Sequence, residues 1–128
     1  METPKDIKYS KDHEWVKLDD DVATIGLTDF AQHQLTDIVF VELPEIGKCV
    51  SQAGNLCIVE SVKSVSDFFS PVSGEVIEVN NELTDKPELI NKDPYGKGWV
   101  AKIKCSVVDE NDKLMSADEY VDFTEKAD

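Results

Sequence analysis

The spacing of apolar and polar residues along the chain predicts a fold made mainly of short β-strands. Residues 14–18 and 22–26 follow a two-residue alternation on either side of the acidic turn Asp19–Asp21, a pattern typical of a hairpin with one buried face. Apolar runs predict further strands at residues 38–43, which we expect to be mostly buried, and at 56–59, 65–69, 75–79 and 99–104. Many short strands with only short helices favour a β-sandwich or a flattened barrel.

Two segments predict helices. Residues 28–35 begin with Thr28, which suits the N-cap position, and place Asp29 at the positive end of the helix dipole. Ser116-Ala117-Asp118-Glu119 is a capping box that opens a C-terminal helix, within a helical segment expected at about residues 111–126. Residues 80–90 are expected to form a loop. We predict a single domain over residues 1–128, with its core at about residues 7–104.

Composition restricts the classes of partner. The chain has 128 residues, with 13 basic and 27 acidic side chains and a formal net charge of −14. This charge repels phosphate backbones and anionic lipids, so we expect neither nucleic acid nor a membrane as a partner. No apolar run approaches the ~18 residues of a membrane span.

The cysteines and the N-terminal residues give weaker indications of the compartment in which the protein works. Cys49, Cys57 and Cys105 are odd in number and lack CxxC spacing, so neither a disulfide framework nor a metal site is expected. Residues 1–6 resemble neither a signal peptide nor a transit peptide. We therefore expect a protein of the bacterial cytoplasm, or the mature form of a mitochondrial matrix protein.

Lys63 is the strongest candidate for chemistry. It lies at the centre of Glu60-Ser61-Val62-Lys63-Ser64, between two predicted strands, where it can present an amine to another protein. The plain alternative is a solvated surface lysine. Ser61 and Ser64 have no histidine near them in the sequence, and no other catalytic constellation is visible. The chain is therefore not expected to be an enzyme.

Several segments, taken in order, resemble the H protein of the glycine cleavage system. The match covers nearly the whole chain, from Lys8 to the C-terminal helix. Its segments are His13-Glu14-Trp15, Gly26-Leu27-Thr28, residues 37–45, Glu60-Ser61-Val62-Lys63-Ser64, residues 70–80, residues 87–91 and Pro94-Tyr95.

The resemblance implies a flattened barrel-sandwich hybrid of the lipoyl- and biotinyl-carrier type, with short helices and a C-terminal helix. It implies a non-catalytic, monomeric carrier that holds one lipoic acid in amide linkage to Lys63, with Glu60, Ser61, Val62 and Ser64 as the supporting motif. The arm would take the aminomethyl group of glycine from glycine decarboxylase (P protein) to aminomethyltransferase (T protein), and electrons to dihydrolipoamide dehydrogenase (L protein). Lipoylating enzymes would be further partners.

The resemblance also implies a cleft that shelters the loaded arm, for which Glu14, Asp67 and Asp12 are the candidate residues. A carboxylate can hold the cargo's ammonium by a charge-assisted hydrogen bond. The alternative is that these are ordinary exposed carboxylates of an acidic protein. Three features depart from the family pattern. Asp12 stands where some members carry a serine, and Thr36 stands where glycine is common. A histidine of some relatives is displaced by one place, so that it is His33 here and Gln34 occupies the expected position.

Two other readings remain open at this point. One is the lipoyl or biotinyl domain of a larger enzyme, although those usually carry Asp-Lys-Ala or Met-Lys-Met at the hairpin tip. The other is a specialised family member that relays lipoyl groups or regulates a partner outside glycine catabolism.

Overall fold

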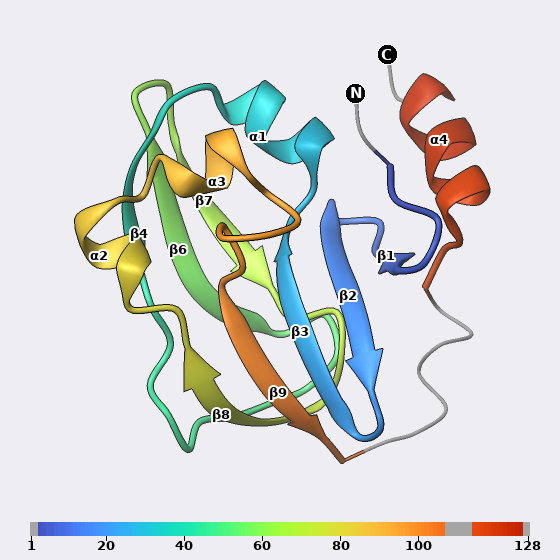
Figure 1. Ribbon diagram of the computed structural model, residues 1–128, viewed down its shortest axis with the longest axis vertical. Helices are drawn as coiled ribbons and strands as arrows, with labels where there is room; N and C mark the ends of the chain where they lie inside the picture. The colour runs from blue at the N-terminus through green and yellow to red at the C-terminus, as the bar shows by residue number, and fades with distance from the viewer. Residues whose placement is uncertain (1–2, 107–113, 127–128) are drawn as a thin grey trace.

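Two antiparallel sheets form the body of the protein. The computed structural model describes residues 3–106 and 114–126. Within them, one sheet has six strands and the other has three, so the mainly β fold expected from the sequence is confirmed (Figure 1). The first has the order β1 (Lys8–Tyr9), β2 (Glu14–Asp19), β3 (Val22–Leu27), β9 (Ala101–Cys105), β8 (Gly74–Val79) and β5 (Cys49–Val50); the second has the order β4 (Ile38–Glu42), β6 (Asn55–Ser61) and β7 (Val65–Phe69).

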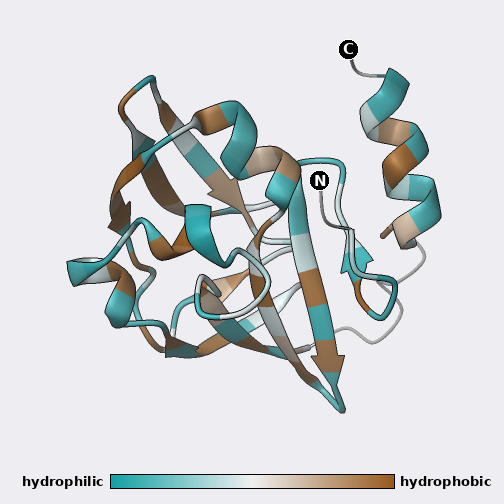
Figure 2. Ribbon diagram, turned by 45° about the horizontal axis from the view of Figure 1, so that its top comes forward, coloured by the Kyte–Doolittle hydropathy of each residue, from teal (hydrophilic) through white to brown (hydrophobic). Residues whose placement is uncertain are grey.

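The β2–β3 hairpin shows how the alternating pattern becomes a core. Val16 pairs with Ile25, and both side chains are buried between the sheets. Asp20 turns the chain with a φ of 57°, a left-handed conformation that aspartate tolerates better than most residues. Figure 2 shows hydrophobic and hydrophilic bands alternating along the strands. Burial in β2 does not follow the alternation throughout, because Trp15 and Val16 are both buried and Leu18 is 39% exposed.

The prediction that residues 38–43 are mostly buried is wrong. Ile38 and Val41 belong to the core, but Val39 and Phe40 remain 53% and 48% exposed. β4 is an edge strand of the three-stranded sheet, and its register shifts between Ile38 and Phe40. Burial of an apolar run depends on what covers each face of the strand, which the run itself does not specify.

Helices connect and cover the sheets. α1 (Asp29–Leu35) begins as predicted, with the Thr28 hydroxyl accepting a hydrogen bond from the Ala31 amide. Residues 80–90, which the sequence predicted as a loop, contain α2 (Glu82–Asp85) and the first two residues of α3 (Leu89–Lys92). Each has only four residues, too few to show a helical period, yet each buries one apolar side chain completely, Leu83 and Ile90 respectively.

α4 (Ala117–Lys126) covers β1 through a cluster of aromatic side chains. The predicted capping box forms in full, because the Ser116 amide donates to the Glu119 carboxylate and the Glu119 amide donates to the Ser116 hydroxyl. Tyr120 stacks on Tyr9 with ring centroids 4.6 Å apart. Leu114–Ser116 precede the helix and pair with β1 through Met115, while residues 111–113 of the expected helical segment lie outside the described residues.

Candidate functional site

Lys63 lies at the exposed tip of the hairpin between β6 and β7, as the sequence predicts (Figure 1). Ser61, the last residue of β6, closes the turn: its amide donates to the Ser64 carbonyl at 2.8 Å. The Ser61 hydroxyl accepts from the amides of Lys63 and Ser64 at 3.2 and 3.0 Å. A serine that bonds to nearby amides in this way stabilises a tight turn. The lysine backbone is therefore held without using its side chain.

A second contact fixes the hairpin to the rest of the protein. The Val62 amide donates to the Asp37 carbonyl at 3.0 Å, which joins the turn to the segment between α1 and β4. The Val62 side chain remains 67% exposed beside Lys63. Glu60, the remaining residue of the motif, is half-buried in β6. The motif thus supplies a rigid turn with an exposed amine and an exposed apolar neighbour.

A cavity of about 460 Å³ lies between α1 and β7, on the strand that leads away from Lys63. Lys63 does not line it, but Ser66 and Asp67, three and four residues further along the chain, do. The lining from α1 is apolar except for Gln34, and the lining from β7 is polar. It comprises Asp12, His13, Leu27, Phe30, Ala31, Gln34, Leu35, Ser66 and Asp67.

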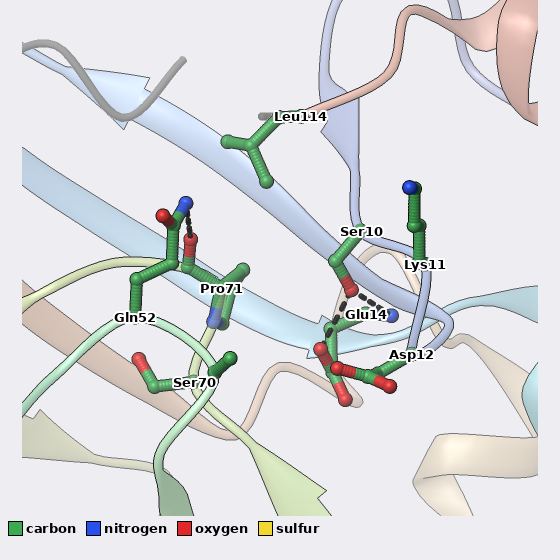
Figure 3. Close-up of a pocket in the computed structure, with 9 residues that line it drawn as sticks. Ser10, Lys11, Asp12, Glu14, Gln52, Ser70, Pro71 and Leu114 are labelled. Carbon is green, nitrogen blue, oxygen red and sulfur yellow. Dashed lines mark hydrogen bonds between the residues drawn. The ribbon is translucent and has the colours of Figure 1, made fainter. Parts of the chain in front are cut away.

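A second cavity, of about 220 Å³, contains Glu14. Figure 3 shows Glu14 beside Ser10 and Asp12, with Ser70, Pro71 and Gln52 on the other side. The Glu14 side chain is only 1% exposed, and its Oε1 accepts a hydrogen bond of 2.6 Å from the Ser10 hydroxyl. Burial raises the pKa of Glu14 to about 8, although hydrogen bonds from Ser10 and the Phe69 backbone act in the opposite direction. Glu14 is therefore a protonated carboxyl at neutral pH.

The three candidate cleft residues do not share one pocket. Glu14 lines the smaller cavity, Asp67 lines the larger one, and Asp12 lines both. Burial of Glu14 excludes the alternative that it is an ordinary exposed carboxylate. Asp67 is exposed and accepts a hydrogen bond from the Asn55 side chain. Its environment is that of an ordinary surface carboxylate. Asp12 is the residue that connects the two cavities.

The positions that depart from the family pattern differ in consequence. Gln34 lines the larger cavity, whereas His33 is exposed and does not. Thr36 ends α1 with φ 66° and ψ −147°, a conformation in which glycine is unstrained and threonine is not. The departure at Thr36 therefore affects the backbone conformation at the end of α1. The departure at Gln34 changes a residue that lines the larger cavity.

His13 is a residue of the larger cavity that the sequence prediction missed. It precedes β2 with a φ of 67°, and it lines the larger cavity, whereas the next residue, Glu14, lines the smaller one. Its Nδ1 lies 2.8 Å from the Tyr120 hydroxyl, and its ring packs on Phe30. Burial lowers the pKa of His13. No local pattern reveals this arrangement, because it depends on a helix more than a hundred residues away.

In the part of the chain that the structure describes, no group of three or more histidine, cysteine or acidic side chains is placed to hold a metal ion. No helix in the same residues is long and apolar enough to cross a membrane.

Comparison with known proteins identifies the family. Residues 7–127 match the family model described as Glycine cleavage H-protein. The chain belongs to this family. It is 50% identical to the glycine cleavage system H protein of Carboxydothermus hydrogenoformans over 96% of the chain and 95% of the relative. It is 52% identical to the mitochondrial glycine cleavage system H protein 2 of Arabidopsis thaliana, over 97% of the chain and 80% of the relative.

The fold leads to the same family. The crystal structure of a glycine cleavage system H protein from Mycobacterium marinum superposes with a TM-score of 0.89 at 38% identity, covering 95% of this chain and 98% of the other. The glycine cleavage H protein is a lipoyl carrier and a non-catalytic component of its system. The chain therefore has a carrier role in glycine cleavage, and the reading as a domain of a larger enzyme is not supported.

Proposed function

We propose that Lys63 holds one lipoyl group in amide linkage and that this arm serves the glycine cleavage reactions. The observation that supports the proposal is the placement of Lys63. Its side chain is exposed at a hairpin tip whose backbone is held by Ser61 and by the Asp37 carbonyl. Such a turn offers the amine to an enzyme without loss of local structure.

Attachment of the lipoyl group to Lys63 is an acyl transfer. The unprotonated Lys63 Nζ attacks the carbonyl carbon of an activated acyl donor, such as an acyl adenylate. A C–N bond forms, the bond from the carbonyl carbon to the activating group breaks, and that group leaves with the electron pair. The proton of the attacking nitrogen passes to a base of the enzyme. The product amide is uncharged, so the extended side chain can enter apolar sites without the cost of burying an ammonium.

The larger cavity suits a slender arm that begins at Lys63. Phe30, Ala31 and Leu35 give it an apolar wall, and Asp67 lies on its β7 side. A lipoyl group in amide linkage to Lys63 would supply a cyclic disulfide to accept the aminomethyl group of glycine, and the arm would remain attached to the protein as a dithiol once that group has been transferred. The protein supplies presentation and shelter, and the enzymes supply the remaining chemistry.

Glu14 is suited to hold an ammonium-bearing cargo. Its carboxyl is neutral at pH 7 while no cation is near, because burial disfavours the charge. An ammonium that enters the cavity favours the ionised form, so Glu14 releases its proton and accepts a charge-assisted hydrogen bond. Asp12, which lines both cavities, would lie along the route to it, and Asp67 nearer the hairpin.

The proposed partners are glycine decarboxylase, aminomethyltransferase, dihydrolipoamide dehydrogenase and a lipoylating enzyme. The net charge of −14 favours partners that present basic surfaces. A tethered cargo meets these enzymes at an effective concentration set by the arm's reach, provided that carrier and enzymes share one compartment. Bacterial cytoplasm and mitochondrial matrix both meet this condition, and relatives from both sources match the chain.

Intact mass measurement tests the attachment site. We expect the protein incubated with a lipoate–protein ligase, lipoate and ATP to gain the mass of one lipoyl group. Lys63→Arg should abolish the gain, whereas Lys97→Arg, which changes an exposed lysine in another turn, should leave it intact. Modification that persists in Lys63→Arg would refute the assignment.

A further inference from the structure

The solvent-facing side of the three-stranded sheet carries a regular mixture of apolar and acidic residues. Phe40 pairs with Glu60, which pairs with Val65; one step further from the hairpin tip, Glu42 pairs with Ile58, which pairs with Asp67. Directly paired residues share a face of the sheet, as do residues two apart on a strand. These six side chains, Phe40, Glu42, Ile58, Glu60, Val65 and Asp67, therefore form one surface, which we call the outer face.

The other side of the same sheet shows that the outer face is not part of the core. There Val41 pairs with Val59, and both are buried between the two sheets. On the outer face, by contrast, Phe40 is 48% exposed and Val65 is 64% exposed. Glu42 and Asp67 are exposed as well, and Ile58 and Glu60 on the central strand are partly exposed.

The outer face continues to the hairpin tip. Val65 is two residues from Lys63, and Val62, itself 67% exposed, adjoins the lysine directly. Exposed apolar residues that gather in one place, unlike those scattered singly, indicate an interaction surface. Here they adjoin the side chain that the proposed function requires another protein to modify.

We propose that the outer face is the docking surface for the enzyme that acylates Lys63. This inference rests on the proposed function. The carboxylates Glu42, Glu60 and Asp67 alternate with Phe40, Ile58 and Val65, so the complementary surface of the enzyme has apolar contacts interspersed with lysine or arginine side chains.

The length of the lysine side chain explains why this enzyme, in particular, needs the outer face. Before acylation the Lys63 ammonium stands on a four-carbon stem, so the acylating active site must take in the hairpin tip itself. The residues that flank the tip on the sheet then come against the enzyme. Enzymes that act on the finished arm reach their substrate at a greater distance from the sheet.

Substitutions on and off the outer face test the proposal. Initial rates of acylation would be measured with the full-length protein, a lipoate–protein ligase, lipoate and ATP. Phe40→Ser and the near-isosteric Val65→Thr should each raise the KM for the carrier by about fivefold or more, with little change in kcat, because they weaken docking and leave the amine in place. Glu42→Gln should raise KM less and reduce its dependence on salt.

Matched controls separate docking from general loss of surface hydrophobicity. Ile46 and Ile77 are 66% and 39% exposed but lie outside the outer face, so Ile46→Ser and Ile77→Ser should leave KM unchanged. Thermal melts would confirm that each variant is folded, and Val65→Thr provides the test if Phe40→Ser does not fold.

The outcomes distinguish this proposal from the proposed function. Wild-type acylation at Lys63 together with an unchanged KM in Val65→Thr would overturn the docking surface and leave the carrier assignment standing. An equal rise in KM for Ile46→Ser would also overturn it. Absence of wild-type acylation at Lys63 would refute both.

Discussion

The Val62 amide donates a hydrogen bond of 3.0 Å to the Asp37 carbonyl, and this contact joins the Lys63 hairpin to the end of α1. The segment that carries Asp37 is itself held by Asn91. The Asn91 side chain accepts from the Ile38 amide at 2.8 Å and donates to the Thr36 carbonyl at 2.7 Å and to Gln32 at 2.9 Å. The rigidity of the hairpin therefore depends on a residue of α3 that does not touch it.

Asn91→Ala should loosen this support. Loss of the three side-chain hydrogen bonds should lower the free energy of unfolding by about 1–3 kcal/mol, as measured by urea denaturation. The Val62 amide should also exchange its hydrogen faster, since its acceptor is less firmly held. Asn81→Ala is the matched control, because Asn81 occupies the N-cap position of α2 but its side chain makes no capping hydrogen bond. Equal exchange of the Val62 amide in both variants would show that Asn91 does not support the hairpin.

Thr36→Gly should make the protein more stable. Thr36 has φ 66° and ψ −147°, where a threonine side chain is strained and glycine is not. Relief of that strain should exceed the entropic cost of glycine in the unfolded chain and give a net gain of roughly 1 kcal/mol. Thr84→Gly, inside α2, should instead reduce stability. A melting temperature that falls in Thr36→Gly would mean that the Thr36 conformation carries no such strain.

Features encoded within a few residues could be predicted from the sequence. The capping residues Thr28 and Ser116 form the hydrogen bonds expected of them, and the hairpin that carries Lys63 closes through its own serine. Each of these depends on contacts between near neighbours. The same holds for the alternating strands β2 and β3.

Features that depend on the order of strands and on distant contacts could not be predicted. Phe40 is exposed because it lies on the outer face of its sheet, whereas Val41 on the same strand faces the core, and His13 contacts Tyr120 of a distant helix. Glu14 and Asp67 line two cavities that have Asp12 in common, an arrangement that the neighbouring residues in the sequence do not specify. A pattern of a few neighbouring residues specifies neither the order of strands in a sheet nor the shape of a cavity.

Glu14 gives the fold a pH dependence of definite sign. Its folded pKa of about 8 lies above the ordinary value of 4.5, so between them the folded state holds a proton that the unfolded state has lost. This stabilising contribution is fully present below pH 4.5 and is lost as the pH rises to about 8. Glu14→Gln stays neutral throughout. Its unfolding free energy minus that of wild type should therefore increase across this range and level off above it.

Urea denaturation at a series of pH values measures this difference. Glu75→Gln, which removes an exposed carboxyl from β8, shows how much of the profile comes from lowering the acidic surface charge alone. The prediction fails if Glu14→Gln and Glu75→Gln give the same profile.

Glu14→Ala tests the role of the buried carboxyl in holding the cargo. The variant should still be lipoylated, because Glu14 lies in a cavity that Lys63 does not line. The aminomethyl-loaded form should lose its cargo about tenfold faster, since removal of a hydrogen bond to a charged group costs ~1.5 kcal/mol or more. Intact mass followed over time measures both properties. Glu75→Ala should match wild type in both, and an unchanged lifetime in Glu14→Ala would show that the cargo is held elsewhere, with Asp12 and Asp67 as the remaining carboxylates on its route.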